Sequence, residues 1–332
     1  MLHRAVRARE RKRLRSSSRA AALLPLLCTA VMAQVDLKSE KDRVAITIDG
    51  QPFTNLYLGP SFAKPFLWPL RSVAGVIVTR RWPIEEIATD SHDHPHHRGL
   101  WIGYGDINGI NFWESEPESK VSPENPSKKG TVRLKKLDEA KSGSKAGHIT
   151  ATFSWQDPEG KEVLEEQRTF TFYRDADIRR IDVDTQLEAK VGARFADTKE
   201  GFFAIRVADS LAGKNGGILT NSEGAQTEKD VWGKRADWVD YVGTADNQKV
   251  GILIMDDARN FRHPPHWHAR DYGLFAVNPF GERAFDPKAG QGGTLLTAGH
   301  SLRFRYRVII HSGDVSKKTI AAWYAGYRLQ SK

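Results

Sequence analysis

The chain has 332 residues, with 50 Lys and Arg against 41 Asp and Glu and a formal net charge of +9. Most of this excess lies in the first 33 residues, which carry eight Lys or Arg and one Glu. Without them the chain is nearly neutral, so its charge gives no reason to predict a nucleic-acid partner. The only cysteine, Cys28, lies in the same segment, so no disulfide is expected in the rest of the chain.

Residues 1–33 have the layout of a secretory signal. Basic residues precede an apolar run from Ala20 to Met32, and small residues lie around Ala33. The run is shorter than the ~20 residues that a membrane-spanning helix needs. We therefore predict cleavage near Ala33, a periplasmic or secreted protein, and no membrane attachment after cleavage.

The rest of the chain has the period-two alternation of antiparallel strands. Every second residue is apolar from Val44 to Ile48, from Ile149 to Trp155 and from Leu302 to Ile310. Helical spacing is confined to the segment around Ile320 to Tyr327. This pattern predicts an all-β protein, a large antiparallel β-sandwich with a short C-terminal helix.

We expect residues 34–332 to form one domain, and a division near Gly130 or Gly147 is the alternative. Two polar, turn-rich segments, Glu114 to Gly130 and Asp138 to Gly147, are expected to be surface loops.

Titratable side chains are concentrated between Asp90 and Arg98, which hold four of the 11 histidines, two aspartates and an arginine. Imidazoles exchange protons near neutral pH, and arginine binds anionic or polyhydroxyl ligands. In an extended segment, His94 and His96 would face one side and His97 the other. A solvated loop is one alternative. Another is a divalent-metal site, in which His94 and His96 need a third ligand from elsewhere.

A second cluster runs from Arg262 to Arg270. His268 and Arg270 share one side of a predicted strand and are the better candidates. For His263 and His266, a place in the site and a place at its rim are equally open. Trp267 is either a sugar-stacking surface or a core residue.

Between the two clusters, the charged pair Lys199 and Glu200 precedes a predicted apolar strand. Glu200 is a candidate general acid or base if Lys199 or Arg206 lies nearby and apolar neighbours raise its pKa. A surface ion pair is the alternative. Trp232 adds an aromatic face suited to stacking on a sugar ring. The sequence has no glycine-rich phosphate loop, Gly-x-Ser-x-Gly elbow or His-Glu-x-x-His motif.

Several of these motifs together resemble the DUF6807 family. They are Asp93–Trp101, Asn108–Trp113, Lys199–Phe203, Trp267–Arg270 and Asn278–Gly281. Members are often labelled "PmoA family protein". We nevertheless do not predict methane oxidation, because the methane monooxygenase subunit of that name spans a membrane and no membrane span is predicted in this chain. The resemblance implies exported proteins with a galactose mutarotase-like supersandwich, a fold that binds carbohydrate in a groove and usually uses a histidine and a carboxylate.

These arguments predict an exported carbohydrate-processing enzyme, of epimerase, lyase or glycoside hydrolase type, that acts on a sugar or keto-sugar without a cofactor. The predicted catalytic residues are His97, Glu200 and His268. The predicted substrate-binding residues are His94, His96, Arg98, Lys199, Arg206, Trp232, Trp267, Arg270 and Asn278. A non-catalytic carbohydrate-binding protein and a metal-dependent enzyme are the alternatives.

Overall fold

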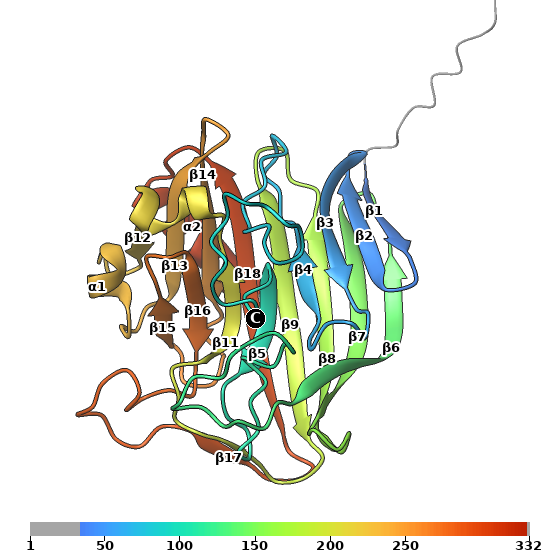
Figure 1. Ribbon diagram of the computed structural model, residues 1–332. Helices are drawn as coiled ribbons and strands as arrows, with labels where there is room; N and C mark the ends of the chain where they lie inside the picture. Colours follow the sequence, from blue (N-terminus) through green and yellow to red (C-terminus); the bar gives the residue numbers. More distant parts are fainter. Residues whose placement is uncertain (1–33, 331–332) are drawn as a thin grey trace, which may run out of the picture. The chain divides into compact units, whose positions relative to one another are not determined.

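The computed structural model describes residues 34–330, so the predicted signal and its cleavage site near Ala33 lie outside the described residues. Strands account for 46% of the described residues and helices for 8%. Two large antiparallel sheets and one short C-terminal helix confirm the predicted all-β sandwich (Figure 1).

Eight strands form the first sheet. In spatial order they are β1 (Val35–Ser39), β2 (Arg43–Ile48), β3 (Gln51–Tyr57), β4 (Phe66–Trp68), β5 (Leu100–Tyr104), β11 (Gly201–Arg206), β16 (Leu274–Asn278) and β15 (His266–Ala269). The sheet therefore joins strands from both halves of the chain. Gly130, one of the two alternative boundaries, falls between β5 and β11, so a division there would separate paired strands.

The second sheet also has eight strands. In spatial order they are β12 (Ile218–Asn221), β13 (Trp238–Ala245), β14 (Gln248–Asp256), β18 (Ser301–Ser312), β9 (Arg179–Ala189), β8 (Glu162–Tyr173), β7 (Ala146–Gln156) and β6 (Thr131–Lys141). The segment from Asp138 to Gly147 is thus mostly the end of one strand and the start of the next, rather than a loop. A small sheet pairs β10 (Ala193–Phe195) with β17 (Thr294–Leu296).

Two short 3₁₀ turns and two α-helices complete the described fold. The 3₁₀ turns are η1 (Asp209–Leu211) and η2 (Gly213–Asn215), and the helices are α1 (Thr227–Val231) and α2 (Lys317–Gln330). The helix predicted around Ile320 to Tyr327 is α2. Its buried residues Ile320, Tyr324 and Tyr327 pack with Ile309 of β18, on the face of the second sheet that points away from the sandwich core.

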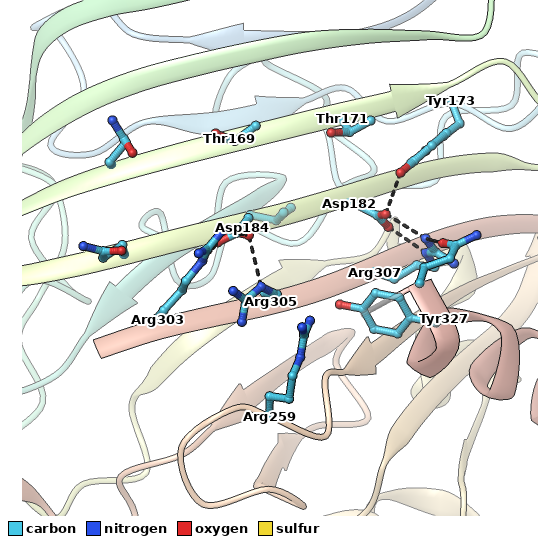
Figure 2. A pocket seen from close by; sticks show the side chains of 14 residues that line it. Thr169, Thr171, Tyr173, Asp182, Asp184, Arg259, Arg303, Arg305, Arg307 and Tyr327 are labelled. Carbon is cyan, nitrogen blue, oxygen red and sulfur yellow. Dashed lines mark hydrogen bonds and ion pairs between the residues drawn. The ribbon is translucent and has the colours of Figure 1, made fainter. Parts of the chain in front are cut away.

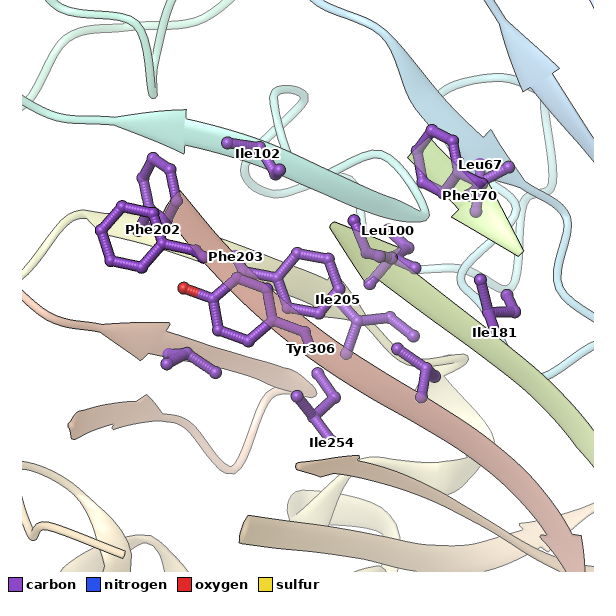
Figure 3. Packing of buried hydrophobic residues seen from close by; sticks show 14 of the residues in the cluster. Leu67, Leu100, Ile102, Phe170, Ile181, Phe202, Phe203, Ile205, Ile254 and Tyr306 are labelled. Carbon is purple, nitrogen blue, oxygen red and sulfur yellow. The ribbon is translucent and has the colours of Figure 1, made fainter. Parts of the chain in front are cut away.

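The core lies between the two sheets and is rich in aromatic rings (Figure 3). Phe203 of the first sheet stacks on Tyr306 of the second, with ring centroids 4.4 Å apart and planes 3° apart. Both side chains are buried, and the predicted alternation from Leu302 to Ile310 places Tyr306 on this inner face. Because the described chain contains no cysteine, this apolar contact area is what holds the sheets together.

Replacing Phe203 by alanine should lower the free energy of unfolding by about 3–5 kcal/mol, because the change removes a ring from a packed core and leaves a cavity. Urea denaturation of the two proteins measures the difference. Leu295, with 63% of its surface exposed, is a matched control whose alanine variant should stay within about 0.5 kcal/mol of the wild type. Equal losses in the two variants would contradict this description of the core.

Candidate active site

One row of side chains runs from β5 to the edge strand β15 of the first sheet, on the face that points away from the second sheet. Trp101 of β5 pairs with Ala204 of β11, which pairs with Ala276 of β16, which pairs with His268 of β15. Directly paired residues share a face of the sheet. The two alanines have short side chains and leave room above the sheet for the loops that surround His268.

The histidine-rich segment is a turn and not an extended strand. The backbone N–H of His97 donates to the carbonyl of His94 at 3.0 Å, and His94 has a φ of 44°. The expectation that His94 and His97 face opposite sides is therefore wrong. Their rings stack on each other, with centroids 4.7 Å apart, and His97 stacks on Trp101 at 5.2 Å.

This turn, the start of β11 and the end of β15 surround a cavity of about 210 Å³, called here the inner cavity. Its lining residues are His94, His96, His97, Glu114, Ser122, Glu124, Lys199, Glu200, His268, Arg270 and Tyr272. Seven residues predicted from the sequence are among them, drawn from three segments that are far apart in the chain.

His268 and Glu200 face each other in the inner cavity. The Nε2 atom of His268 accepts a hydrogen bond from Nε of Arg270 at 3.2 Å. An arginine only donates, so the ring proton is on Nδ1, which lies 3.6 Å from Oε2 of Glu200. Burial, followed by the charges of Arg270 and Lys199, holds the pKa of His268 well below its usual value, so the ring is neutral.

The carboxyl group of Glu200 is buried, and burial raises its pKa to about 7. The Lys199 ammonium, 3.7 Å from Oε1, acts in the opposite direction, while the charge of Glu114 raises the pKa further. A carboxyl group with this pKa exists in both protonation states near neutral pH, which suits a general acid or base.

His97 is held by a buried arginine beneath it. Nη1 of Arg206 donates to Nδ1 of His97 at 3.3 Å, which places the ring proton on Nε2. Nε2 is buried and has no hydrogen-bond partner in the described structure. Burial and the neighbouring His96 and His94 hold the pKa of His97 well below its usual value. His97 is thus a neutral ring with an unused N–H donor.

Arg206 does not line the inner cavity, although it was predicted to bind substrate. Its side chain is fully buried, and Nη2 donates to Asp93 at 2.7 Å and to Ser91 at 3.0 Å. Because its N–H groups donate to the turn that carries His97, Arg206 orients that ring and does not bind a ligand in the inner cavity.

Arg98, Trp267 and Asn278 also lie outside the inner cavity, which corrects their predicted contact with substrate. Arg98 forms ion pairs with Glu116 and Glu118. Trp267 is fully buried in the core, where its indole N–H donates to a backbone carbonyl. The Asn278 amide donates to the carbonyls of residues 198 and 199, so it braces the loop before Glu200.

Trp232, His266 and His263 do not line the inner cavity. The guanidinium of Arg270 lies 5.5 Å from the Trp232 ring, so Trp232 supports a lining residue. His266 contacts Glu282, while His263 contacts Asp256 and Asp237.

Four lining residues were not predicted: Glu114, Ser122, Glu124 and Tyr272. Three of them lie in the polar segment expected to be a surface loop. Glu114 is buried and accepts hydrogen bonds from Asn111 and Asn125 at 2.9 and 2.8 Å. The Asn111–Trp113 motif directly before Glu114 is the sequence signal that could have identified it. Tyr272 stacks on His94 at 4.9 Å, a contact with no local sequence pattern.

A larger pocket, of about 480 Å³, lies on the outer face of the second sheet (Figure 2). Arg303, Arg305 and Arg307 project there from β18, beside Asp184 and Asp182 of β9. The carboxylates pair with these guanidinium groups at 2.6–3.1 Å. This is the pattern of a cross-strand ion-pair ladder, and it contains none of the predicted site residues.

Within residues 34–330, no three His, Cys, Asp or Glu side chains are grouped so that they could hold a metal ion. Over the same range, no helix is long and apolar enough to cross a membrane.

A family model described as "Family of unknown function (DUF6807)" matches residues 43–325. No curated protein matches the chain.

Solved structures with an alignable fold include two α-galactosidases and a lyase. The GH36 α-galactosidase AgaA of Geobacillus stearothermophilus is 12% identical, with a TM-score of 0.38, and the match covers 84% of this chain and 40% of that one. The α-galactosidase of Lactobacillus brevis is 9% identical, with a TM-score of 0.40 and coverage of 84% and 39%. The heparan sulfate lyase HepC of Pedobacter heparinus is 8% identical, with a TM-score of 0.37 and coverage of 86% and 36%. The chain thus spans about two fifths of the length of these proteins.

Proposed function

The chain belongs to the DUF6807 family, a family of unknown function, so we propose its function from the chemistry of the inner cavity. We propose that the protein is an enzyme that processes a sugar or keto-sugar by acid–base catalysis. One observation carries the proposal. A buried carboxyl group whose pKa is raised to about 7 shares a small cavity with two neutral imidazoles, His97 and His268.

In this proposal, Glu200 moves the proton. Near neutral pH it can take a proton from a sugar carbon or hydroxyl, or give one to a leaving oxygen. The Nδ1–H group of His268 lies 3.6 Å from Oε2 of Glu200 and has no hydrogen-bond partner in the described structure, so it is placed to stabilise the ionised carboxylate. The free Nε2–H of His97 donates to a substrate oxygen on which negative charge develops, the role that a fixed donor performs best in a buried site.

The cations of the inner cavity are suited to holding the substrate. Lys199 and Arg270 both line it, and Arg270 is also paired with Glu228 at 2.8 Å. Epimerisation, elimination and glycoside hydrolysis all need a proton moved at a sugar carbon or oxygen, so all three reaction types remain within the proposal.

The test is to incubate residues 34–332 with sugars, keto-sugars and glycosides while following new NMR signals. A product identifies the reaction type. The variants Glu200→Gln, His268→Gln and His97→Gln should each lose turnover while the protein stays folded. Binding of a sugar without any product, or unchanged turnover in all three variants, would contradict an enzymatic role and leave a carbohydrate-binding protein.

We further propose that the protein is exported. The expected result is that a full-length chain produced in a bacterium is recovered from the periplasm or medium with a mass that lacks residues 1–33. Mass spectrometry of the intact protein measures this. A Leu24→Arg change interrupts the apolar run and should leave the full mass inside the cell. An uncleaved wild-type chain in the cytoplasm would refute export.

A further inference from the structure

A second pocket adjoins the inner cavity and is called here the outer pocket. It has a volume of about 480 Å³. Four side chains line both spaces: His94, His96, Glu114 and Ser122. The two spaces are therefore neighbours that share part of their lining.

The outer pocket has a fixed aromatic surface. The ring of His92 stacks on Trp82, with centroids 4.9 Å apart and planes 12° apart. The guanidinium of the buried Arg80 lies 5.1 Å from the Trp82 ring, which ties this pair to the protein interior. The His92 side chain is 46% exposed, so part of the stacked pair faces solvent. A rigid, partly exposed aromatic pair is a suitable surface for the apolar face of a sugar ring.

Polar groups around this surface can bind hydroxyls. Glu118 and the exposed Lys120 line the outer pocket, and Glu114 and Ser122 lie in the wall that it shares with the inner cavity. A few convergent polar groups beside an aromatic surface are typical of a small-molecule site.

The volumes indicate a substrate larger than one ring. Ligand pockets in proteins usually have volumes of about 300–1,000 Å³. The inner cavity, at about 210 Å³, is smaller than this range, whereas the outer pocket lies within it. A ligand that fills the inner cavity with one sugar unit has space for a second unit directly beyond His94 and Glu114.

We propose that the outer pocket is a second subsite, which binds a further sugar unit of a disaccharide or longer glycan. This inference rests on the proposed function, because it assumes that the inner cavity holds a sugar. In such a complex the bond between the two units lies at the shared wall, beside His94, His96 and Glu114.

The experiment measures binding in the Glu200→Gln variant and in the wild type by ligand-observed NMR. The probes are methyl α-glucoside, methyl β-glucoside and methyl β-galactoside, each compared with its disaccharide: methyl maltoside, methyl cellobioside and methyl lactoside. At least one disaccharide should bind ten-fold or more tightly than its monosaccharide. The double variant His92→Ala, Lys120→Ala should remove that gain and leave monosaccharide binding unchanged.

The matched control is the double variant His300→Ala, Lys288→Ala, which changes an exposed histidine and an exposed lysine that line neither pocket. It should keep the full gain. The second subsite is overturned if no disaccharide binds more tightly than its monosaccharide, or if the outer-pocket variant and the control behave alike. Turnover at the wild-type rate in Glu200→Gln refutes the proposed acid–base function but leaves a measured disaccharide preference intact, so the two failures can be told apart.

Discussion

The Glu200→Gln variant should lose about 10²–10⁴-fold in turnover, the usual contribution of a positioned general acid or base. Glutamine keeps the shape of the side chain but cannot exchange a proton in this pH range. The measurement is the initial rate on the substrate that the sugar panel identifies. The wild-type rate should also change around pH 7, where Glu200 titrates, and the variant's residual rate should lack that step.

The same variant should be more stable than the wild type above pH 7. Burial raises the folded-state pKa of Glu200 to about 7, above its unfolded value, so the folded protein binds the proton more tightly. The resulting stability is fully present below the unfolded pKa and is lost as the pH rises through 7. Glutamine avoids ionisation in the buried site, so the gain above pH 7 is on the order of 3 kcal/mol.

Urea denaturation at several pH values measures this gain in stability. A variant that loses turnover while it gains stability has not failed through misfolding. A wild-type protein whose stability does not fall between about pH 4.5 and 7 relative to the variant would contradict the raised pKa of Glu200.

Replacing Arg206 by methionine should lower turnover by about 10²-fold, although Arg206 does not touch the inner cavity. The change removes the donor to Nδ1 of His97, so nothing fixes the proton on Nε2 or the angle of the ring. A small displacement of a catalytic group is enough for a loss of this size. Arg80, 2.7 Å from Asp93, still pairs with that carboxylate in the variant.

Nitrogen NMR of His97 separates positioning from a general loss of structure, because the shifts of the two ring nitrogens report which one carries the proton. The variant should show a mixture of the two forms, and the wild type a single one. Arg305→Met, on the outer face of the second sheet, is the matched control and should leave both the shifts and the rate unchanged. An unaltered His97 spectrum in the Arg206 variant would contradict this role.

Local patterns in the sequence were sufficient to predict the fold class and several residues that line the inner cavity. Alternation from Leu302 to Ile310 predicted a half-buried strand, and the spacing from Ile320 to Tyr327 predicted the C-terminal helix, because such periodicities follow from the local geometry of the backbone. His268 and Glu200 were identified from residue type and near neighbours, and both line the inner cavity.

Which of these side chains meet depends on contacts between distant segments. The row from Trp101 to His268 depends on the register of four strands, which no local pattern encodes. The turn at His94 brings histidines to one side that an extended strand would separate. Arg206 and Trp267 are residue types that often bind ligands, yet Arg206 lies beneath His97 and Trp267 lies in the core. The histidine-rich segment is therefore one wall of a cavity that β11 and β15 complete. Sequence period and composition are local properties, whereas a cavity depends on contacts between distant segments.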